Sequence, residues 1–247
     1  MNALVGHFRH LDLFSGIGGF ALAAEAAGWN TVGFAEVDDY ASRVLKRHWP
    51  DVPNFRDVRN VPAMPVDLVT GGFPCQPFSH AGKQRGREDA RYLWPDMLKV
   101  VQKCKPSWVL GENVPGIVNM ELENVCLDLE AKGYEVWPLD IPACAAGAWH
   151  RRARIWIVAY AERVQPGAQS HDGPVRRMGR IVKPVAWDRD WQDALREFRG
   201  VDDGLSYGVD RTDGLRNAIV PQVAYPLLRW MREGLCMANE RSHGSDD

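Results

Sequence analysis

Short apolar or β-branched runs alternate with longer amphipathic runs from Phe8 to Asp140, and this alternation constrains the fold more than any other feature. Strands that alternate with helices are typical of successive βαβ units, which build a largely parallel sheet covered by helices. The sequence therefore predicts an α/β, doubly wound fold. We expect its strands in the runs HFRHLDLF, TVGFAEVD, PVDLVTGG, SWVLGENV, YEVWPLDI and ARIWIVAYA.

The pattern changes after the last of these strands. Between about Glu162 and Asp213, Gly, Pro, Asp, Arg and Trp dominate and the regular periodicity fades. An amphipathic helical pattern then returns in LRNAIVPQVAYPLLRWMREG. We expect a main domain at 1–161, a small second region at 162–213 and a C-terminal segment at 214–247 that rejoins the main domain and ends in a frayed tail.

Charge and cysteine content narrow the class of protein. The formal net charge of -2 excludes a general polycation, so a nucleic acid would have to meet a local basic face. The five cysteines show no spacing typical of zinc sites. No apolar stretch reaches membrane-spanning length, and the first residues lack a secretory signal pattern. We expect a cytoplasmic protein with reduced thiols, no metal and no membrane partner.

Two features follow the first two strands. Gly16, Gly18 and Gly19 lie between the first strand and its helix, where glycine lets a ligand approach the backbone and the helix amides. Glu36 ends the second strand 20 residues after Gly16, at a distance suited to binding ribose hydroxyls. A tight turn and a solvated acid are the ordinary explanations. Together the two features favour a nucleotide-like ligand, although the spacing is not that of a dinucleotide site.

Cys75 follows the third strand and is flanked by Pro74 and Pro77. Proline restricts the torsions of its own residue and of its neighbour, so the thiol is presented on a stiff loop. A single cysteine is ordinarily a small buried hydrophobe. The two prolines, a glycine pair and the strand end favour a nucleophile instead.

Glu112 ends the fourth strand and is followed by Asn113 and a turn. Partial burial favours the protonated form of a carboxyl group, which suits it to donate a proton near neutral pH. Further along, strand alternation would place Arg152 and Arg154 on one face, where both can reach a shared polar group. A turn acid and a solvated basic rim are the alternatives.

Seven motifs occur in one order along the chain: DLFSGIGGF, AEVD, GGFPCQPFS, LWPDML, GENV, HRRARIWIVA and RNAIVPQVA. In these motifs the chain resembles the DNA cytosine carbon-5 methyltransferases. The resemblance covers nearly the whole chain except residues 162–213. The proline-cysteine loop with the later Glu-Asn-Val is highly specific, whereas the glycine loop is shared with many methyltransferases. The resemblance implies a Rossmann-like S-adenosylmethionine-dependent methyltransferase fold with S-adenosyl-L-methionine as cofactor. It also implies methyl transfer to carbon 5 of a flipped-out cytosine in double-stranded DNA.

The resemblance also implies roles at the cofactor. Glu36 would bind the ribose, Val37 would lie against the adenine, and Asp57 in FRDVRN would accept from the adenine amino group. Further cofactor contacts are implied for Phe14, Gly16, Gly18, Gly72, Pro74, Leu93, Asn217 and Ala218.

At the cytosine, the resemblance makes Cys75 the nucleophile that attacks carbon 6. Glu112 would engage ring nitrogen 3 and the exocyclic amine. Arg154, with Arg152 behind it, would hold the base and the acid, and Asn113 would brace the cysteine loop. Covalent activation suits this unreactive aromatic ring because it divides one high barrier into smaller ones.

Basic residues outside these motifs are candidates for contact with DNA. The segment SHAGKQRGREDARYL after the cysteine fits a lid whose arginines and lysine meet phosphates, or a polar surface loop. The stretch HDGPVRRMGRIVK and the two nearby tryptophans fit a minimal recognition region, or a small core with solvated arginines. The DNA-binding candidates are Lys83, Arg85, Arg87, Arg91, Arg176, Arg177, Arg180 and Lys183.

Three departures from the family pattern leave questions open. His150 replaces the usual Gln, Arg216 replaces the usual Gly before Asn-Ala, and the region at 162–213 is short for target recognition. Sequence specificity could thus be short, relaxed or supplied by an accessory subunit, and a cognate endonuclease is a further possible partner. The alternatives are RNA cytosine methylation and a catalytically silent DNA-binding relative. We expect a monomer, associated with the nucleoid if the source is bacterial or phage.

Overall fold

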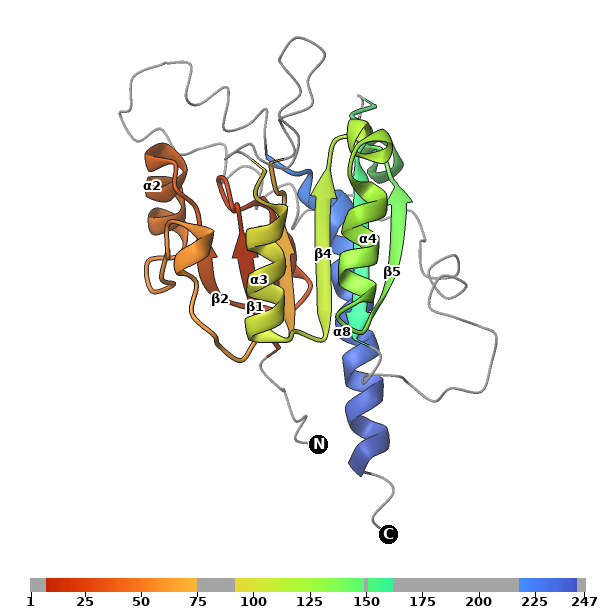
Figure 1. Ribbon diagram of the computed structural model, residues 1–247. Coiled ribbons are helices and arrows are strands. Elements are labelled where there is room, and N and C mark those ends of the chain that lie inside the picture. The colour runs from red at the N-terminus through yellow and green to blue at the C-terminus, as the bar shows by residue number, and fades with distance from the viewer. Residues whose placement is uncertain (1–7, 75–91, 149–150, 162–217, 244–247) are drawn as a thin grey trace.

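The computed structural model describes residues 8–74, 92–148, 151–161 and 218–243, with side chains of the last helix described through Cys236. One six-stranded sheet, in the order β2-β1-β3-β4-β6-β5, forms its centre (Figure 1). β1 to β4 are mutually parallel neighbours, whereas β6 runs antiparallel to both β4 and β5. The strands are β1 (Arg9–Leu13), β2 (Asn30–Ala35), β3 (Leu68–Gly71), β4 (Trp108–Asn113), β5 (Tyr134–Asp140) and β6 (Ile155–Ala161).

Helices cover both faces of this sheet. α3 (Trp94–Cys104) and α4 (Leu122–Glu130) lie on one face, and α1 (Gly19–Ala26) and α8 (Pro221–His243) pack against each other on the other (Figure 1). α2 (Asp39–His48) follows β2 at the edge of the sheet. The mostly parallel sheet between two helical layers confirms the predicted α/β, doubly wound class. Short 3-10 helices are η1 (Val58–Asn60), η3 (Pro115–Asn119) and η4 (Ala143–Ala146).

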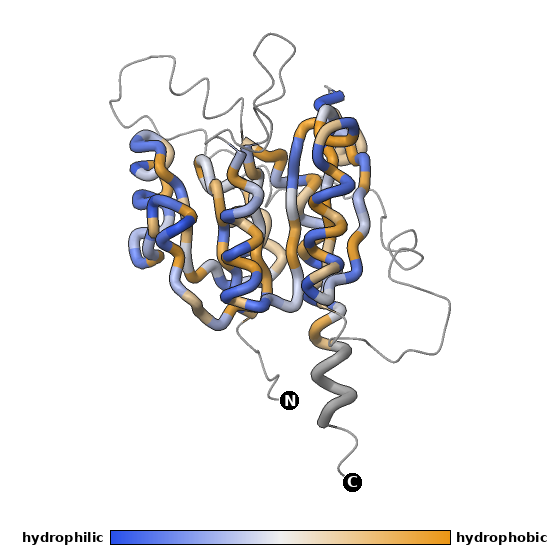
Figure 2. The backbone as a smooth tube through the Cα atoms, viewed as in Figure 1, coloured by the Kyte–Doolittle hydropathy of each residue, from blue (hydrophilic) through white to orange (hydrophobic). Residues whose placement is uncertain are grey.

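The alternation of side chains along the strands supplies the two larger of the three hydrophobic clusters among the described residues. Leu11, Val69 and Val109 point to the face covered by α3 and α4. Leu68 and Leu110 point to the face covered by α1 and α8. Figure 2 shows that the helices in front of the sheet alternate between hydrophobic and hydrophilic residues, as expected when one side of each is buried.

Local signals explain where the helices begin. The Asp38 carboxylate accepts a hydrogen bond from the Ala41 amide at 2.8 Å and so caps α2. Pro95 stands in the first turn of α3, where no amide donor is needed. α8 is tied to the N-terminal half of the chain because the Trp29 indole donates to the Leu228 carbonyl at 2.9 Å.

A buried chain of polar side chains joins β2, β1 and β3. His10 contacts the Thr31 hydroxyl at 3.0 Å and the Thr70 hydroxyl at 2.8 Å, and Thr70 donates to the Asp12 carboxyl at 2.8 Å. Both ionisable groups have no exposed surface. Burial lowers the pKa of His10 to about 3 and raises the pKa of Asp12 to about 8, so both are neutral at pH 7. This chain therefore avoids placing a net charge inside the sheet.

The predicted division at residues 161 and 213 stays a prediction, because 162–217 lie outside the described residues.

Candidate active site

A cavity of about 570 Å³ opens where the parallel strands end at their carboxyl edge. Ligands of open α/β sheets bind at this edge because the loops that follow neighbouring strands meet there. Nine of the residues predicted to bind a cofactor line this cavity: Phe14, Gly16, Glu36, Val37, Asp57, Gly72, Pro74, Leu93 and Ala218.

The glycine turn after β1 meets the acid after β2 directly. The Gly16 amide donates to Glu36 Oε2 at 2.7 Å, and the Asp38 amide donates to Glu36 Oε1 at 2.8 Å. Gly16 has a φ of 54°, and a Cβ atom added to it would meet no atom within 4 Å. The turn therefore leaves open space beside a fixed carboxylate.

Gly18 has a different environment. It lies outside the cavity lining, with a φ of 89°, at the N-cap of α1. A Cβ atom added to it would lie 2.5 Å from the Trp49 ring, which follows α2. The absence of a side chain at Gly18 thus serves the packing of α1 against the end of α2.

Asp57 is held at the rim of the cavity by Arg59, a residue not predicted from the sequence. Arg59 donates to both carboxylate oxygens of Asp57, with an ion-pair distance of 2.5 Å. These hydrogen bonds lower the pKa of Asp57 to about 2, so the carboxylate stays ionised and able to accept. The sequence signal for this ion pair was the spacing of two residues between Asp57 and Arg59.

The cavity lining also includes residues not predicted from the sequence, among them Ile17, Tyr40, Arg56 and Arg59.

Glu112 and Arg154 form an ion pair next to this cavity. Arg154 Nε lies 2.8 Å from Glu112 Oε1, and Glu112 is 9% exposed. Burial raises the pKa of Glu112, against the opposing charges of Arg154 and Arg152, in the direction expected from the sequence. Gly72, which lines the cavity, is so close that an added Cβ atom would lie 3.6 Å from Glu112 Oε2. The acid and the cavity therefore share a wall.

The predicted strand geometry around Arg152 is wrong. β6 begins only at Ile155, and Arg152 has a φ of 33°, so strand alternation does not position the two arginines. Arg154 pairs with Glu112, whereas Arg152 Nη2 donates to the Ala218 carbonyl at 2.6 Å. Both charges still act on Glu112, and Arg152 in addition connects this acid to the segment before α8.

Asn113 reaches back toward the end of β3. Its Nδ2 donates to the Phe73 carbonyl at 2.9 Å, and its Oδ1 accepts from the Val114 amide at 2.9 Å. Asn113 is 4% exposed, so these bonds lie in a buried environment where their loss is costly. The contact holds the backbone two residues before Cys75.

Several predicted residues lie outside the described ranges, together with residues 79–91 of the predicted lid segment, His150 and Arg216. Within those ranges, no group of three or more His, Cys, Asp or Glu side chains could hold a metal ion. The same residues include no helix with the length and apolar character needed to cross a membrane. The predicted residues not described are Cys75, Lys83, Arg85, Arg87, Arg91, Arg176, Arg177, Arg180, Lys183 and Asn217.

Comparison with known proteins identifies relatives of this chain by sequence. The chain is 36% identical over 166 residues to the type II methyltransferase M.HgiCII of Herpetosiphon aurantiacus, covering 64% of this chain and 38% of that protein. It is 33% identical over 168 residues to the type II methyltransferase M.MspI of Moraxella sp, covering 64% and 40%. The chain thus spans about two fifths of the length of these relatives.

Fold similarity extends further than sequence similarity. A crystal structure of a DNMT2 mutant from Spodoptera frugiperda aligns with a TM-score of 0.65 at 14% identity, covering 91% of this chain and 99% of that one. This likeness supports the Rossmann-like methyltransferase fold. The family model for C-5 cytosine-specific DNA methylases matches residues 8–179. The chain belongs to the C-5 cytosine-specific DNA methylase family.

Proposed function

We propose that this protein transfers a methyl group from S-adenosyl-L-methionine to carbon 5 of cytosine in double-stranded DNA, through a covalent adduct with Cys75. The observation that carries the proposal is the Glu112–Arg154 ion pair, in which Glu112 lies against Gly72, a residue of the cavity lining. A cytosine held by that pair would lie next to a ligand in the cavity. The type II methyltransferases among the relatives support the same activity.

The cavity has the chemistry that S-adenosylmethionine requires. Glu36 offers carboxylate oxygens suited to ribose hydroxyls, and Asp57 offers an ionised acceptor suited to an adenine amine. Phe14 and Leu93 add apolar surface, and the open space beside Gly16 lets a ligand approach the backbone. When bound, the cofactor supplies a methyl group on a positively charged sulfur, which is electrophilic.

The residues of the chain would then activate the cytosine. The Cys75 thiolate would bond to carbon 6 and make carbon 5 nucleophilic enough to take the methyl group from the sulfonium sulfur. Loss of the carbon-5 proton to water and departure of the thiolate would then break the sulfur–carbon bond and restore the ring. Because burial raises its pKa, Glu112 is suited to donate to ring nitrogen 3. Arg154 orients the acid and the base, and Asn113 holds the backbone before Cys75.

DNA would be bound by basic residues outside the cavity. The target atom is inaccessible inside a duplex, so the cytosine must be flipped into the site. The lysines and arginines at 83–91 and 176–183 are the proposed phosphate and groove contacts. A recognition region at 162–213, a monomeric state, a cytoplasmic location and a cognate endonuclease stay predictions.

One experiment tests this proposal against its alternatives. Purified protein is incubated with methyl-labelled cofactor and either duplex DNA or structured RNA, beside a Cys75→Ala control. We expect label in DNA with the parent protein alone, and bisulfite sequencing of the product should report the target sequence. Label in RNA alone would favour an RNA methyltransferase, and no label in either would favour a silent relative.

A further inference from the structure

The loop that carries Glu36 and Val37 is held by the segment that follows α2. The Phe34 amide donates to the Pro53 carbonyl at 2.9 Å, and the Phe55 amide donates to the Phe34 carbonyl at 2.8 Å. This parallel bridge pairs Phe34 with Asn54 at the end of β2. Beyond this bridge, hydrogen bonds from side chains rather than from backbone groups alone connect the segment to the loop that carries Glu36 and Val37.

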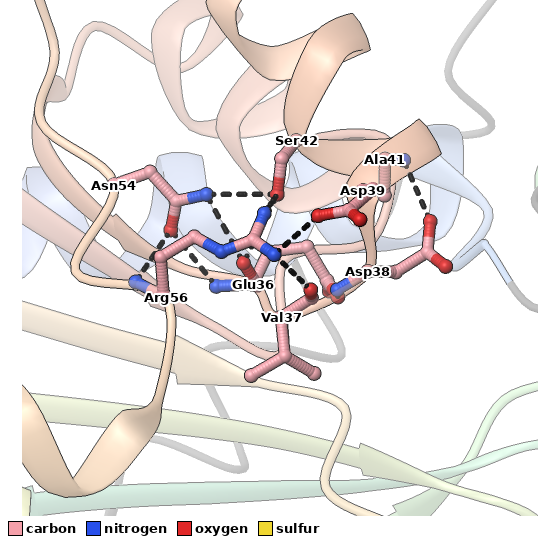
Figure 3. A network of polar contacts seen from close by, with 8 residues as sticks. All are labelled: Glu36, Val37, Asp38, Asp39, Ala41, Ser42, Asn54 and Arg56. Atoms are coloured by element: carbon pink, nitrogen blue, oxygen red, sulfur yellow. Dashed lines mark hydrogen bonds and ion pairs between the residues drawn. The ribbon is translucent and has the colours of Figure 1, made fainter.

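The Asn54 side chain extends the pairing to Glu36. Its Oδ1 accepts from the amides of Glu36 and Arg56, each at 3.0 Å. Its Nδ2 donates to the Glu36 carbonyl at 3.1 Å and to the Ser42 hydroxyl at 3.0 Å (Figure 3). These four contacts match the two acceptor sites and two donor hydrogens of an amide, so the side chain has one satisfied orientation.

Arg56 holds the next residue of the loop. Its guanidinium donates to the Val37 carbonyl, to Asp39 Oδ1 and to the Ser42 hydroxyl, each at 2.5 Å. Figure 3 shows the Val37 side chain pointing away from these contacts. Val37 is 61% exposed and lines the cavity. Arg56 thus binds one side of the Val37 peptide, while the Val37 side chain forms part of the cavity wall.

The backbone of Arg56 indicates that this arrangement is more than a surface ion pair. Its φ is 64°, in the left-handed region that glycine adopts readily and arginine does not. Strained residues persist where their surroundings determine their conformation, and they cluster at ligand clamps. The Asn54 hydrogen bond to the Arg56 amide is part of those surroundings.

We propose that Asn54 and Arg56 form a clamp that positions Glu36 and Val37 before the cofactor binds. They are positioning residues, acting through the loop that they hold. The link to S-adenosylmethionine rests on the proposed function, whereas the order that the clamp imposes on residues 36–42 does not. A preorganised loop lowers the ordering cost of binding and so increases affinity.

Arg56→Gly separates this role from a contribution to stability. Glycine removes the guanidinium and also relieves the left-handed strain, so we expect the thermal midpoint to be unchanged or higher. We expect the dissociation constant for S-adenosylhomocysteine, measured by calorimetry, to rise at least about tenfold. Turnover at saturating cofactor should stay near the parent value. Asn54→Asp, which keeps the size but loses both donors, should weaken binding in the same way.

The matched control is Arg229→Ala. Arg229 is an exposed arginine of α8 whose Nε lies 3.0 Å from Glu233, so this variant also removes one surface ion pair. Its affinity for S-adenosylhomocysteine should equal that of the parent. An Arg56→Gly variant with parental affinity would overturn the clamp.

Adenosine tests which part of the cofactor depends on Arg56, a residue that itself lines the cavity. The clamp predicts that Arg56→Gly weakens binding of adenosine by the same factor as S-adenosylhomocysteine, since Glu36 and Val37 serve the adenosine part. Weakened binding of S-adenosylhomocysteine with unchanged binding of adenosine would assign Arg56 to the amino acid part and overturn the clamp.

Hydrogen exchange without ligand separates failure of the clamp from failure of the proposed function. The clamp predicts faster amide exchange in residues 36–42 of Arg56→Gly than in the parent protein, and unchanged exchange in β4. Parent protein that binds no S-adenosylhomocysteine would contradict the proposed cofactor while this exchange result still supports the clamp. Equal exchange in residues 36–42 would overturn the clamp whatever the cofactor.

Discussion

Arg154 Nε lies 2.8 Å from Glu112 Oε1 at the end of β4, and burial nevertheless raises the pKa of the acid. The cost of removing the carboxylate from water thus exceeds the attraction of the two arginines nearby. A group with a raised pKa stabilises the fold fully below its ordinary pKa, and that contribution is lost as the pH rises through the raised value. Glu112 is therefore suited to its proposed chemistry at the expense of stability near neutral pH.

Glu112→Gln should separate these two effects. We expect methyl transfer to fall at least about 100-fold, because an amide cannot supply the proton. We expect the thermal midpoint to stay equal or to rise, with a difference from the parent that grows toward higher pH. The control Glu130→Gln alters an exposed glutamate of α4 and should change neither quantity. Full activity of Glu112→Gln would contradict the role of this acid.

Asp12 should govern the pH dependence of stability. Burial raises its pKa from 3.8 to about 8, so its contribution is complete below pH 3.8 and disappears as the pH rises through about 8. Asp12→Asn removes this titration. In urea unfolding, the variant should therefore gain stability relative to the parent between pH 5 and pH 8, by up to about 1.4 kcal/mol per pH unit. A difference independent of pH would show that Asp12 titrates normally.

Glu36→Gln should weaken cofactor binding without unfolding the protein. The carboxylate accepts from the Gly16 and Asp38 amides, and charged acceptors contribute about 1.5–3 kcal/mol per bond. We expect the affinity for S-adenosylhomocysteine, measured by calorimetry, to fall about tenfold or more. Glu123→Gln on the exposed side of α4 is the control. Parental affinity in Glu36→Gln would remove this residue from the site.

Gly16 and Gly18 should respond differently to the same substitution. Gly18→Ala places a Cβ atom 2.5 Å from the Trp49 ring, so we expect a loss of about 2 kcal/mol or more in the free energy of unfolding. Gly16→Ala meets no atom within 4 Å, so it should cost about 1 kcal/mol through its backbone conformation. Gly16→Ala should instead weaken cofactor binding, because its methyl group projects into open space beside the cavity. Equal effects of both variants on stability would contradict this assignment.

The sequence predicts well which edge of the sheet holds the site. Each parallel strand ends in a turn marked by glycine or an acid, and the carboxyl ends of parallel strands meet at one edge. This rule brings Gly16, Glu36 and Gly72 to the cavity and Glu112 beside it. Local patterns suffice here because the geometry follows from strand direction alone.

Contacts between segments far apart in the sequence were not predictable in the same way. Arg152 leaves the strand pattern with a φ of 33° and donates to Ala218, which is 66 residues away. Asn54 and Arg56 gain their partners only when the segment after α2 returns beside β2. In the sequence alone, His10 and Asp12 look like ordinary polar residues of a strand. Their role in a buried hydrogen-bonded chain is visible only once Thr70 of β3 lies between them.

The covalent step gives the most direct test of the proposed mechanism. A duplex carrying 5-fluorocytosine at the target position cannot lose a proton from carbon 5, so the adduct with Cys75 should accumulate when S-adenosylmethionine is present. Mass spectrometry of the parent protein should then show one covalently attached DNA strand, and Cys75→Ala should show none. Methylation of unmodified duplex DNA by Cys75→Ala at the parental rate would contradict the mechanism.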